Sequence, residues 1–176
     1  MDEVVQGFAT LRSCCAAALR GEAGSVLPEA DFAASGLPLA ERHRVVSLVA
    51  AGLGGAAQEA FRRRVLALAQ QTIRLEQELG IITALWSAAG VEFLVLKGPA
   101  LARQAYPVPE WRVFDDLDLW VESRDLAAAV RALEDAGYHR SQPPGKHAAA
   151  CARRAGTDVA LVPSAPGRLV EVGPGV

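Results

Sequence analysis

The segment from residue 91 to residue 121 limits the fold of this chain more than any other, because it orders two strands around a glycine turn and a short helix. Residues 91–96 are apolar nearly throughout, which predicts a buried strand in a central position of its sheet. A sharp turn at Lys97 and Gly98 follows, and the next helix begins with a proline, where a missing N–H costs nothing. The second strand of the segment is acidic.

Two aspartates, Asp116 and Asp118, stand two residues apart on that second strand. Side chains alternate between the faces of a strand, so we expect both carboxylates on one face, with Leu117 and Leu119 on the other face in the core. Neighbouring carboxylates repel each other unless a cation lies between them, which indicates a site for a divalent metal. The other interpretation is that both aspartates lie on a solvated edge.

Three further residues of this segment are suited to an anion. Gly98 follows a strand and opens a helix, where free backbone N–H groups can receive an anion. Lys97 precedes it, and the chain has only one other lysine, Lys146. Arg112 stands four residues before Asp116 and can hold a phosphate oxygen in a bidentate manner.

A third carboxylate is expected near the C-terminal end. Residues 158–162 and 168–172 read as two short strands joined by a Pro- and Gly-rich turn, which predicts a hairpin. Glu171 alternates with Val170 and Val172, so it should point away from the side that these two valines bury. Asp158 is the competing candidate for the third acid.

The first half of the chain reads as helical. Apolar residues recur at spacings of three and four over residues 2–20, 39–53 and 58–89. Gly80 is the expected place for a bend or break in the longest of these helices. Its regular stripe could be the seam of a coiled coil, but packing of one helix across a helical subdomain is the preferred interpretation.

These elements predict an α+β fold with a helical N-terminal region over residues 1–90 and an α/β core over residues 91–176. The core is expected to be a small mixed sheet with flanking helices. A length of 176 residues, half of them hydrophobic, fits one domain or one domain with a helical extension.

Bulk properties exclude some partners and compartments. The net charge of −2 gives no electrostatic footprint for duplex nucleic acid, and no apolar run is long enough to cross a membrane. The three cysteines have no metal-binding spacing, and the N-terminus lacks the pattern of a signal peptide. A cytoplasmic, reducing location is therefore expected.

Three stretches, LVLKGPALARQAYP, WRVFDDLDLWV and DLAAAVRALEDAGY, resemble an uncharacterised nucleotidyltransferase family of the DNA polymerase-beta-like superfamily. The strong resemblance covers about residues 94–138, and a weaker one covers about 39–172. The superfamily more commonly has Gly-Ser where Lys97 and Gly98 stand here. Glu171 matches the Glu of the family's Val-Glu-Leu-His-Trp segment, but the His and Trp are missing. The core is expected to be short at its C-terminal end, because relatives continue there.

The resemblance implies a metal-dependent enzyme that moves a nucleoside monophosphate from a nucleoside triphosphate such as ATP to a hydroxyl acceptor and releases pyrophosphate. Two Mg²⁺ ions are expected, with Mn²⁺ as a substitute. The acceptor is expected to be a protein, a peptide or a small molecule, since the charge argues against long nucleic acid. The implied ligands of the metal, which are also the catalytic residues, are Asp116, Asp118 and Glu171, and the implied nucleotide-binding residues are Lys97, Gly98 and Arg112.

Two other functions remain open at this point. The chain could be a catalytically inactive nucleotide-binding or regulatory module of the same fold, which the missing His and Trp after Glu171 favour. It could also be a helical protein-interaction subunit that uses the stripe from Phe61 to Trp86, with the Asp pair incidental. No residue marks the nucleobase that is read or the acceptor that is modified.

Overall fold

The computed structural model is α+β, and it describes residues 2–28, 31–140, 159–163 and 170–174. The chain divides into two compact units, and helix α4 (Gly55–Ala88) contributes to both. The first unit contains Met1–Thr72 and Ala102–Val113, and the second contains Ile73–Leu101 and Phe114–Val176. The division into a helical region over residues 1–90 and an α/β core over residues 91–176 stays a prediction.

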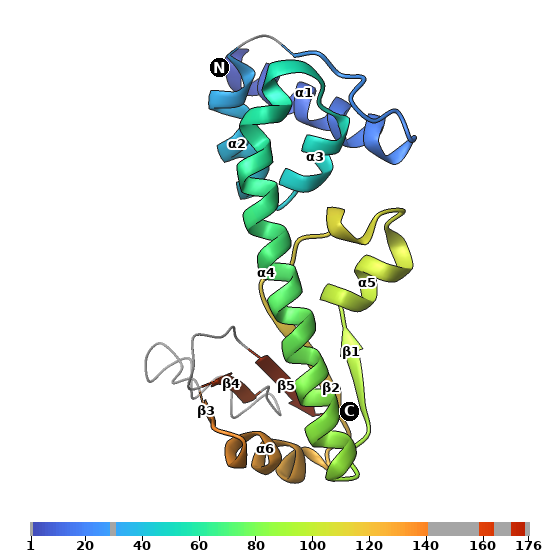
Figure 1. Cartoon of the computed structure of the whole chain (residues 1–176), viewed down its shortest axis with the longest axis vertical. Coiled ribbons are helices and arrows are strands. Elements are labelled where there is room, and N and C mark those ends of the chain that lie inside the picture. Colours follow the sequence, from blue (N-terminus) through green and yellow to red (C-terminus); the bar gives the residue numbers. More distant parts are fainter. Residues whose placement is uncertain (1, 29–30, 141–158, 164–169, 175–176) are drawn as a thin grey trace. The chain divides into compact units, whose positions relative to one another are not determined.

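The first unit is built from helices (Figure 1): α1 (Asp2–Leu19), α2 (Phe32–Arg42), α3 (Val46–Gly52) and the first part of α4 (Gly55–Ala88). The helix expected over residues 2–20 is confirmed. The single helix expected over residues 39–53 is wrong, because the chain turns between α2 and α3. Arg44 takes a left-handed φ of 56° there, and Val45 N–H donates to the Ala40 carbonyl at 2.9 Å, which ends α2 in a Schellman motif.

Helices α1 and α3 approach each other very closely at one glycine. A Cβ added to Gly52 would lie only 2.1 Å from the carbonyl oxygen of Cys14. The buried side chains around this crossing include Cys14, Val49 and Leu53, none of which has measurable exposure. Gly52 therefore allows the two helix backbones to meet.

Helix α4 runs without interruption through Gly80, so the expected break is wrong (Figure 1). Its buried face repeats every seven residues. Phe61 and Leu68 belong to the core of the first unit, whereas Leu75 and Ile82 belong to the core of the second. Packing across a helical subdomain is therefore confirmed for the first half of the stripe, whereas the second half packs with residues of the sheet.

The second unit contains one mixed sheet in the order β1-β2-β5-β4-β3. Strands β2 and β5 are parallel, and the other neighbouring pairs are antiparallel. The pairing of β4 with β5 confirms the predicted hairpin. The strands are β1 (Phe93–Leu96), β2 (Leu117–Val121), β3 (Tyr138–Arg140), β4 (Val159–Pro163) and β5 (Val170–Pro174). The remaining elements are α5 (Gly98–Ala105), the 3-10 helix η1 (Pro109–Trp111) and α6 (Leu126–Asp135).

One face of this sheet packs against α6 and the second half of α4. Trp86 of α4 is completely buried, its indole N–H donates to the Ala129 carbonyl of α6 at 3.0 Å, and its ring meets Phe93 edge-on at 5.0 Å between centroids. Tyr138 donates its hydroxyl to Glu78. Burial, together with this bond and the charge of Glu78, raises the pKa of Tyr138.

The other face of the sheet is open along β1. Leu94 and Leu96 are 58% and 41% exposed, while Phe93 and Val95, which alternate with them, are half-buried. β1 lies at the edge of the sheet, so its expected central position is wrong. An apolar run does not show whether both of its faces are covered, and here only one is.

Candidate functional site

The turn after β1 lies beside the acidic segment. In the antiparallel register of β1 and β2, Leu96 pairs with Asp118, so the chain leaving β1 passes the residues that precede β2. At Gly98 a Cβ would lie 3.4 Å from the Phe114 ring and 3.6 Å from the Asp116 carbonyl oxygen. Two motifs that are separated by about twenty residues in the sequence are therefore brought together.

The two aspartates have different positions. Asp118 is within β2, where buried and half-buried residues alternate, and its side chain is 15% exposed. Leu117 and Leu119 on either side are buried, which confirms that Asp118 faces away from the core. Asp116 is half-buried and lies one residue before β2 begins, so a common face for the two carboxylates stays a prediction.

Lys97 makes an ion pair with Asp118. Its Nζ lies 3.3 Å from Asp118 Oδ2. Its φ of 48° is in the left-handed region, which costs a non-glycine residue roughly 1–2 kcal/mol. Glycine would avoid that strain, so a lysine at this turn points to a use for its side chain.

Helix α5 begins at this turn with its positive end. Lys97 supplies the first acceptor, because its carbonyl receives the Leu101 N–H at 2.7 Å. The N–H groups of Gly98 and Ala100 precede this bond and have no acceptor within the helix, and Pro99 has no N–H. Backbone donors and the helix dipole thus favour an anion next to the Lys97 ammonium.

The remaining expected site residues are placed less completely. Glu171 is the register partner of Asp118 in the parallel pair of β2 and β5, but its side chain is outside the described part of the structure, as is all of Asp158. Arg112 belongs to the first unit and donates to the Val113 carbonyl. The assignments of Glu171 and Arg112 therefore stay predictions.

The donor set fits a divalent cation. No group of three or more metal-binding side chains is found among the residues that the structure describes, and Glu171 is not among those with a described side chain. Asp118 nevertheless holds a positive group at 3.3 Å, and Asp116 stands two residues away. Carboxylate oxygens are the ligands that Mg²⁺ prefers.

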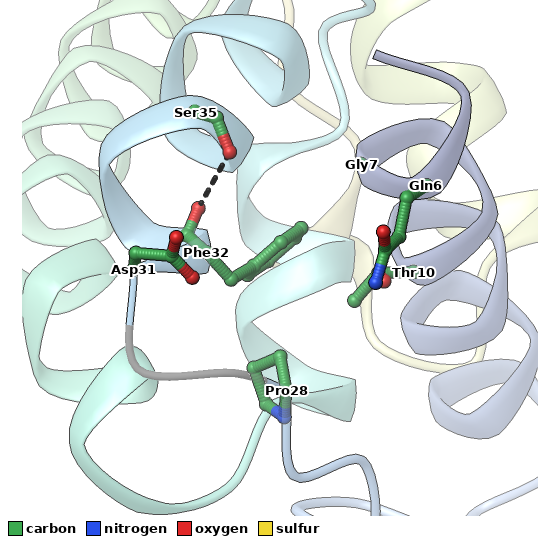
Figure 2. Close-up of a pocket in the computed structure, with 7 residues that line it drawn as sticks. All are labelled: Gln6, Gly7, Thr10, Pro28, Asp31, Phe32 and Ser35. Atoms are coloured by element: carbon green, nitrogen blue, oxygen red, sulfur yellow. Dashed lines mark hydrogen bonds between the residues drawn. The ribbon is translucent and has the colours of Figure 1, made fainter. Parts of the chain in front are cut away.

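Among the hollows in the described regions, two are large enough for a drug-sized ligand and a third is much smaller. The smallest, about 60 Å³, is lined by residues of α1 and the start of α2 such as Gln6, Asp31 and Ser35 (Figure 2). A hollow of about 480 Å³ in the first unit is lined by Arg62 and Trp111 among others.

The third hollow, about 430 Å³, is lined by Leu94 and Trp120 with Glu92 and Glu122 beside them. Trp120 alternates with the same buried residues as Asp118, so it shares the face of Asp118. The sequence reasoning did not select Trp120, although its spacing of two from Asp118 was a usable signal. It offers an aromatic surface near the acidic pair.

Comparison with known proteins gives one match. A family model described as "Uncharacterised nucleotidyltransferase" matches residues 34–165, which is more than half of the chain. Searches of the curated proteins and of the solved structures found no match. In the described residues, no helix has the length and apolar character needed to cross a membrane.

Proposed function

Because the chain belongs to this uncharacterised nucleotidyltransferase family, we propose that it transfers a nucleoside monophosphate from a nucleoside triphosphate to a hydroxyl acceptor. The observation that carries the proposal is the meeting of an acidic strand with a positively charged turn. Asp118 lies 3.3 Å from Lys97, and α5 begins at the next residue. Such a site offers ligands for a metal ion and for the phosphates of a nucleotide.

The carboxylates of Asp116 and Asp118, together with Glu171, are the proposed holders of Mg²⁺. The metal would neutralise phosphate charge and orient the reacting oxygens. Lys97 and the N–H of Gly98 would bind the non-transferred phosphates and stabilise the pyrophosphate that leaves. Arg112 is proposed as an additional phosphate ligand.

The reaction itself is a substitution at the α-phosphorus. The acceptor oxygen forms a bond to this phosphorus, and the bond to the oxygen that bridges the α- and β-phosphates breaks. The electron pair of the broken bond leaves with pyrophosphate, and the acceptor proton passes to solvent. Lys97 is well placed for this task, since a flexible ammonium group can follow charge that moves onto the leaving phosphates.

The acceptor is proposed to be a protein, a peptide or a small molecule rather than a long nucleic acid, because the net charge of the chain is −2. The open hollow at Leu94 and Trp120 is a candidate place for the nucleobase or the acceptor. The proposal assigns the reaction to the cytoplasm, and the free thiols of Cys14 and Cys15 support a reducing setting.

Asp118→Asn is the variant that tests the proposal. Purified protein is incubated with each α-labelled nucleoside triphosphate, Mg²⁺ and a panel of protein, peptide, sugar and alcohol acceptors. Transfer of label with release of pyrophosphate is expected, and Asp118→Asn should lower its rate by about 100-fold or more. Asp135→Asn, an exposed carboxylate at the end of α6, is the matched control and should keep full activity.

Two results would speak against an enzyme with this site. Nucleotide binding without transfer, across all four nucleotides and the whole panel, would favour a non-catalytic nucleotide-binding module. Equal transfer rates for Asp118→Asn and the unmodified protein would show that this carboxylate is not part of the active site. Circular dichroism of both variants checks that the fold is retained.

A further inference from the structure

The ion pair between Lys97 and Asp118 is strongly asymmetric. The Asp118 side chain is 15% exposed, whereas that of Lys97 is 70% exposed. The carboxylate is therefore fixed within a strand, and the ammonium approaches it from solvent. A partly buried carboxylate gains from a counter-ion, and Lys97 supplies one from within the chain.

The backbone of Lys97 is held by its neighbours in the chain, whereas its side chain is largely exposed. Its amide lies at the end of β1, its carbonyl accepts the first hydrogen bond of α5 at 2.7 Å, and its φ is 48°. Its exposed aliphatic arm starts between Asp118 and the first residue of α5, and rotation about its side-chain bonds is open to it. The ammonium can therefore lie against the carboxylate or in front of the helix N-terminus.

A divalent cation and this ammonium compete for the same oxygen. If a cation binds Asp118 alone, it must displace Lys97 and is then repelled by the displaced positive charge. If the cation binds together with a triphosphate, the displaced ammonium can pair with the phosphates beside the N–H of Gly98. The nucleotide thus removes the repulsion that a cation alone would meet.

We propose that Lys97 is a tethered counter-ion that makes the site select a metal–nucleotide complex over the free metal ion. Metal and nucleotide then strengthen each other's binding, and the coupling passes through one side chain. The proposed selectivity for the metal–nucleotide complex rests on the proposed function, because it assumes that the ligand is a nucleotide. The competition between Lys97 and a cation at Asp118 does not.

Metal binding without nucleotide is the first test. Mn²⁺ is titrated into the full chain and its free concentration is followed by electron paramagnetic resonance. Lys97→Gln, which removes the charge and keeps a polar side chain, should bind Mn²⁺ about fivefold more tightly than the unmodified protein. Lys97→Arg keeps the cation and should bind as the unmodified protein does.

A non-hydrolysable nucleoside triphosphate analogue completes the comparison. In the unmodified protein the analogue should strengthen Mn²⁺ binding. In Lys97→Gln this strengthening should be about fivefold smaller, because the repulsion that the nucleotide relieves is absent. An equal effect of the analogue in both proteins would overturn the proposal.

The ammonium can also be observed directly, since the chain has only two lysines. Reductive methylation with ¹³C-formaldehyde labels both lysines and the N-terminal amine and keeps their charge. In nuclear magnetic resonance spectra, Mg²⁺ should move the Lys97 signal, which is assigned by its loss in Lys97→Arg, toward its position in Asp118→Asn. A Lys97 signal that ignores both Mg²⁺ and Asp118→Asn would overturn the proposal.

The outcomes separate this inference from the proposed function. Transfer that depends on Asp118, with no tighter Mn²⁺ binding in Lys97→Gln, would overturn the inference alone. Tighter Mn²⁺ binding in Lys97→Gln without transfer to any acceptor would overturn the proposed enzyme and retain the competition. Absence of Mn²⁺ binding in every variant, with the nucleotide analogue as well as without it, would overturn both.

Discussion

Gly52 and Gly80 are both helical glycines, yet replacing each with alanine should change stability in opposite directions. At Gly52, in α3, the added methyl group would lie 2.1 Å from the Cys14 carbonyl oxygen and 2.7 Å from its carbonyl carbon. At Gly80, in α4, it would meet no atom within 4 Å. Neither glycine has a positive φ, so the packing around each site decides the difference.

The expected magnitudes follow from these contacts. An ordinary contact requires at least 3.4 Å, and the obstructing atoms at Gly52 belong to the backbone, so α1 and α3 must separate. Overpacking of a core costs about 1–3 kcal/mol, and an obstacle that cannot rotate away places Gly52→Ala near 3 kcal/mol. Gly80→Ala should stabilise the protein by about 0.5–1 kcal/mol through helix propensity.

Urea unfolding and thermal melting, both followed by circular dichroism, measure the two effects. For a chain of this size, Gly52→Ala should lower the melting temperature by about 6–12 °C and Gly80→Ala should raise it by about 1–4 °C. If the free energy of unfolding of Gly52→Ala is within about 1 kcal/mol of that of the unmodified protein, α1 and α3 do not approach each other this closely. A destabilising Gly80→Ala would contradict the open surface at that position.

Two further predictions concern a tryptophan and a thiol. Trp86→Phe should cost about 2 kcal/mol in urea unfolding, roughly half from the lost bond to the Ala129 carbonyl and half from the cavity beside Phe93; an unchanged stability would contradict this packing. Burial, with a smaller contribution from Cys15, raises the pKa of the Cys14 thiol from 9.0 to about 11. The unfolded chain therefore loses this proton at a lower pH than the folded chain does. The resulting stabilisation of about 2–3 kcal/mol is fully present below pH 9 and should disappear as the pH rises from 9 to 11. Unfolding under reducing conditions at pH 8 and pH 10 should show a smaller difference in Cys14→Ala, and an equal difference would exclude Cys14 as its cause.

The sequence by itself determined the local elements and the identity of the acidic motif. The helix at residues 2–20, the periodic helix over residues 58–89 and the C-terminal hairpin follow from residue spacing, because a side chain's face is fixed by its position in the repeat. The continuity of the long helix through Gly80 did not follow from the sequence, since a break was expected there. The same rule placed Asp118 opposite Leu117 and Leu119, and the Lys-Gly turn was visible as a break between strand and helix.

Only the tertiary structure decided which elements meet. An apolar run such as residues 93–96 shows the same residue pattern whether its strand lies at the edge of a sheet or at its centre. The position depends on whether a second strand pairs with it, and the run itself does not determine that. Arg44 ends α2 in the left-handed conformation that glycine adopts most easily. Because an arginine stands there instead of a glycine, the sequence did not mark the end of this helix. The pairing of Lys97 with Asp118 depends on the register of β1 against β2, which long-range packing sets and local propensity does not.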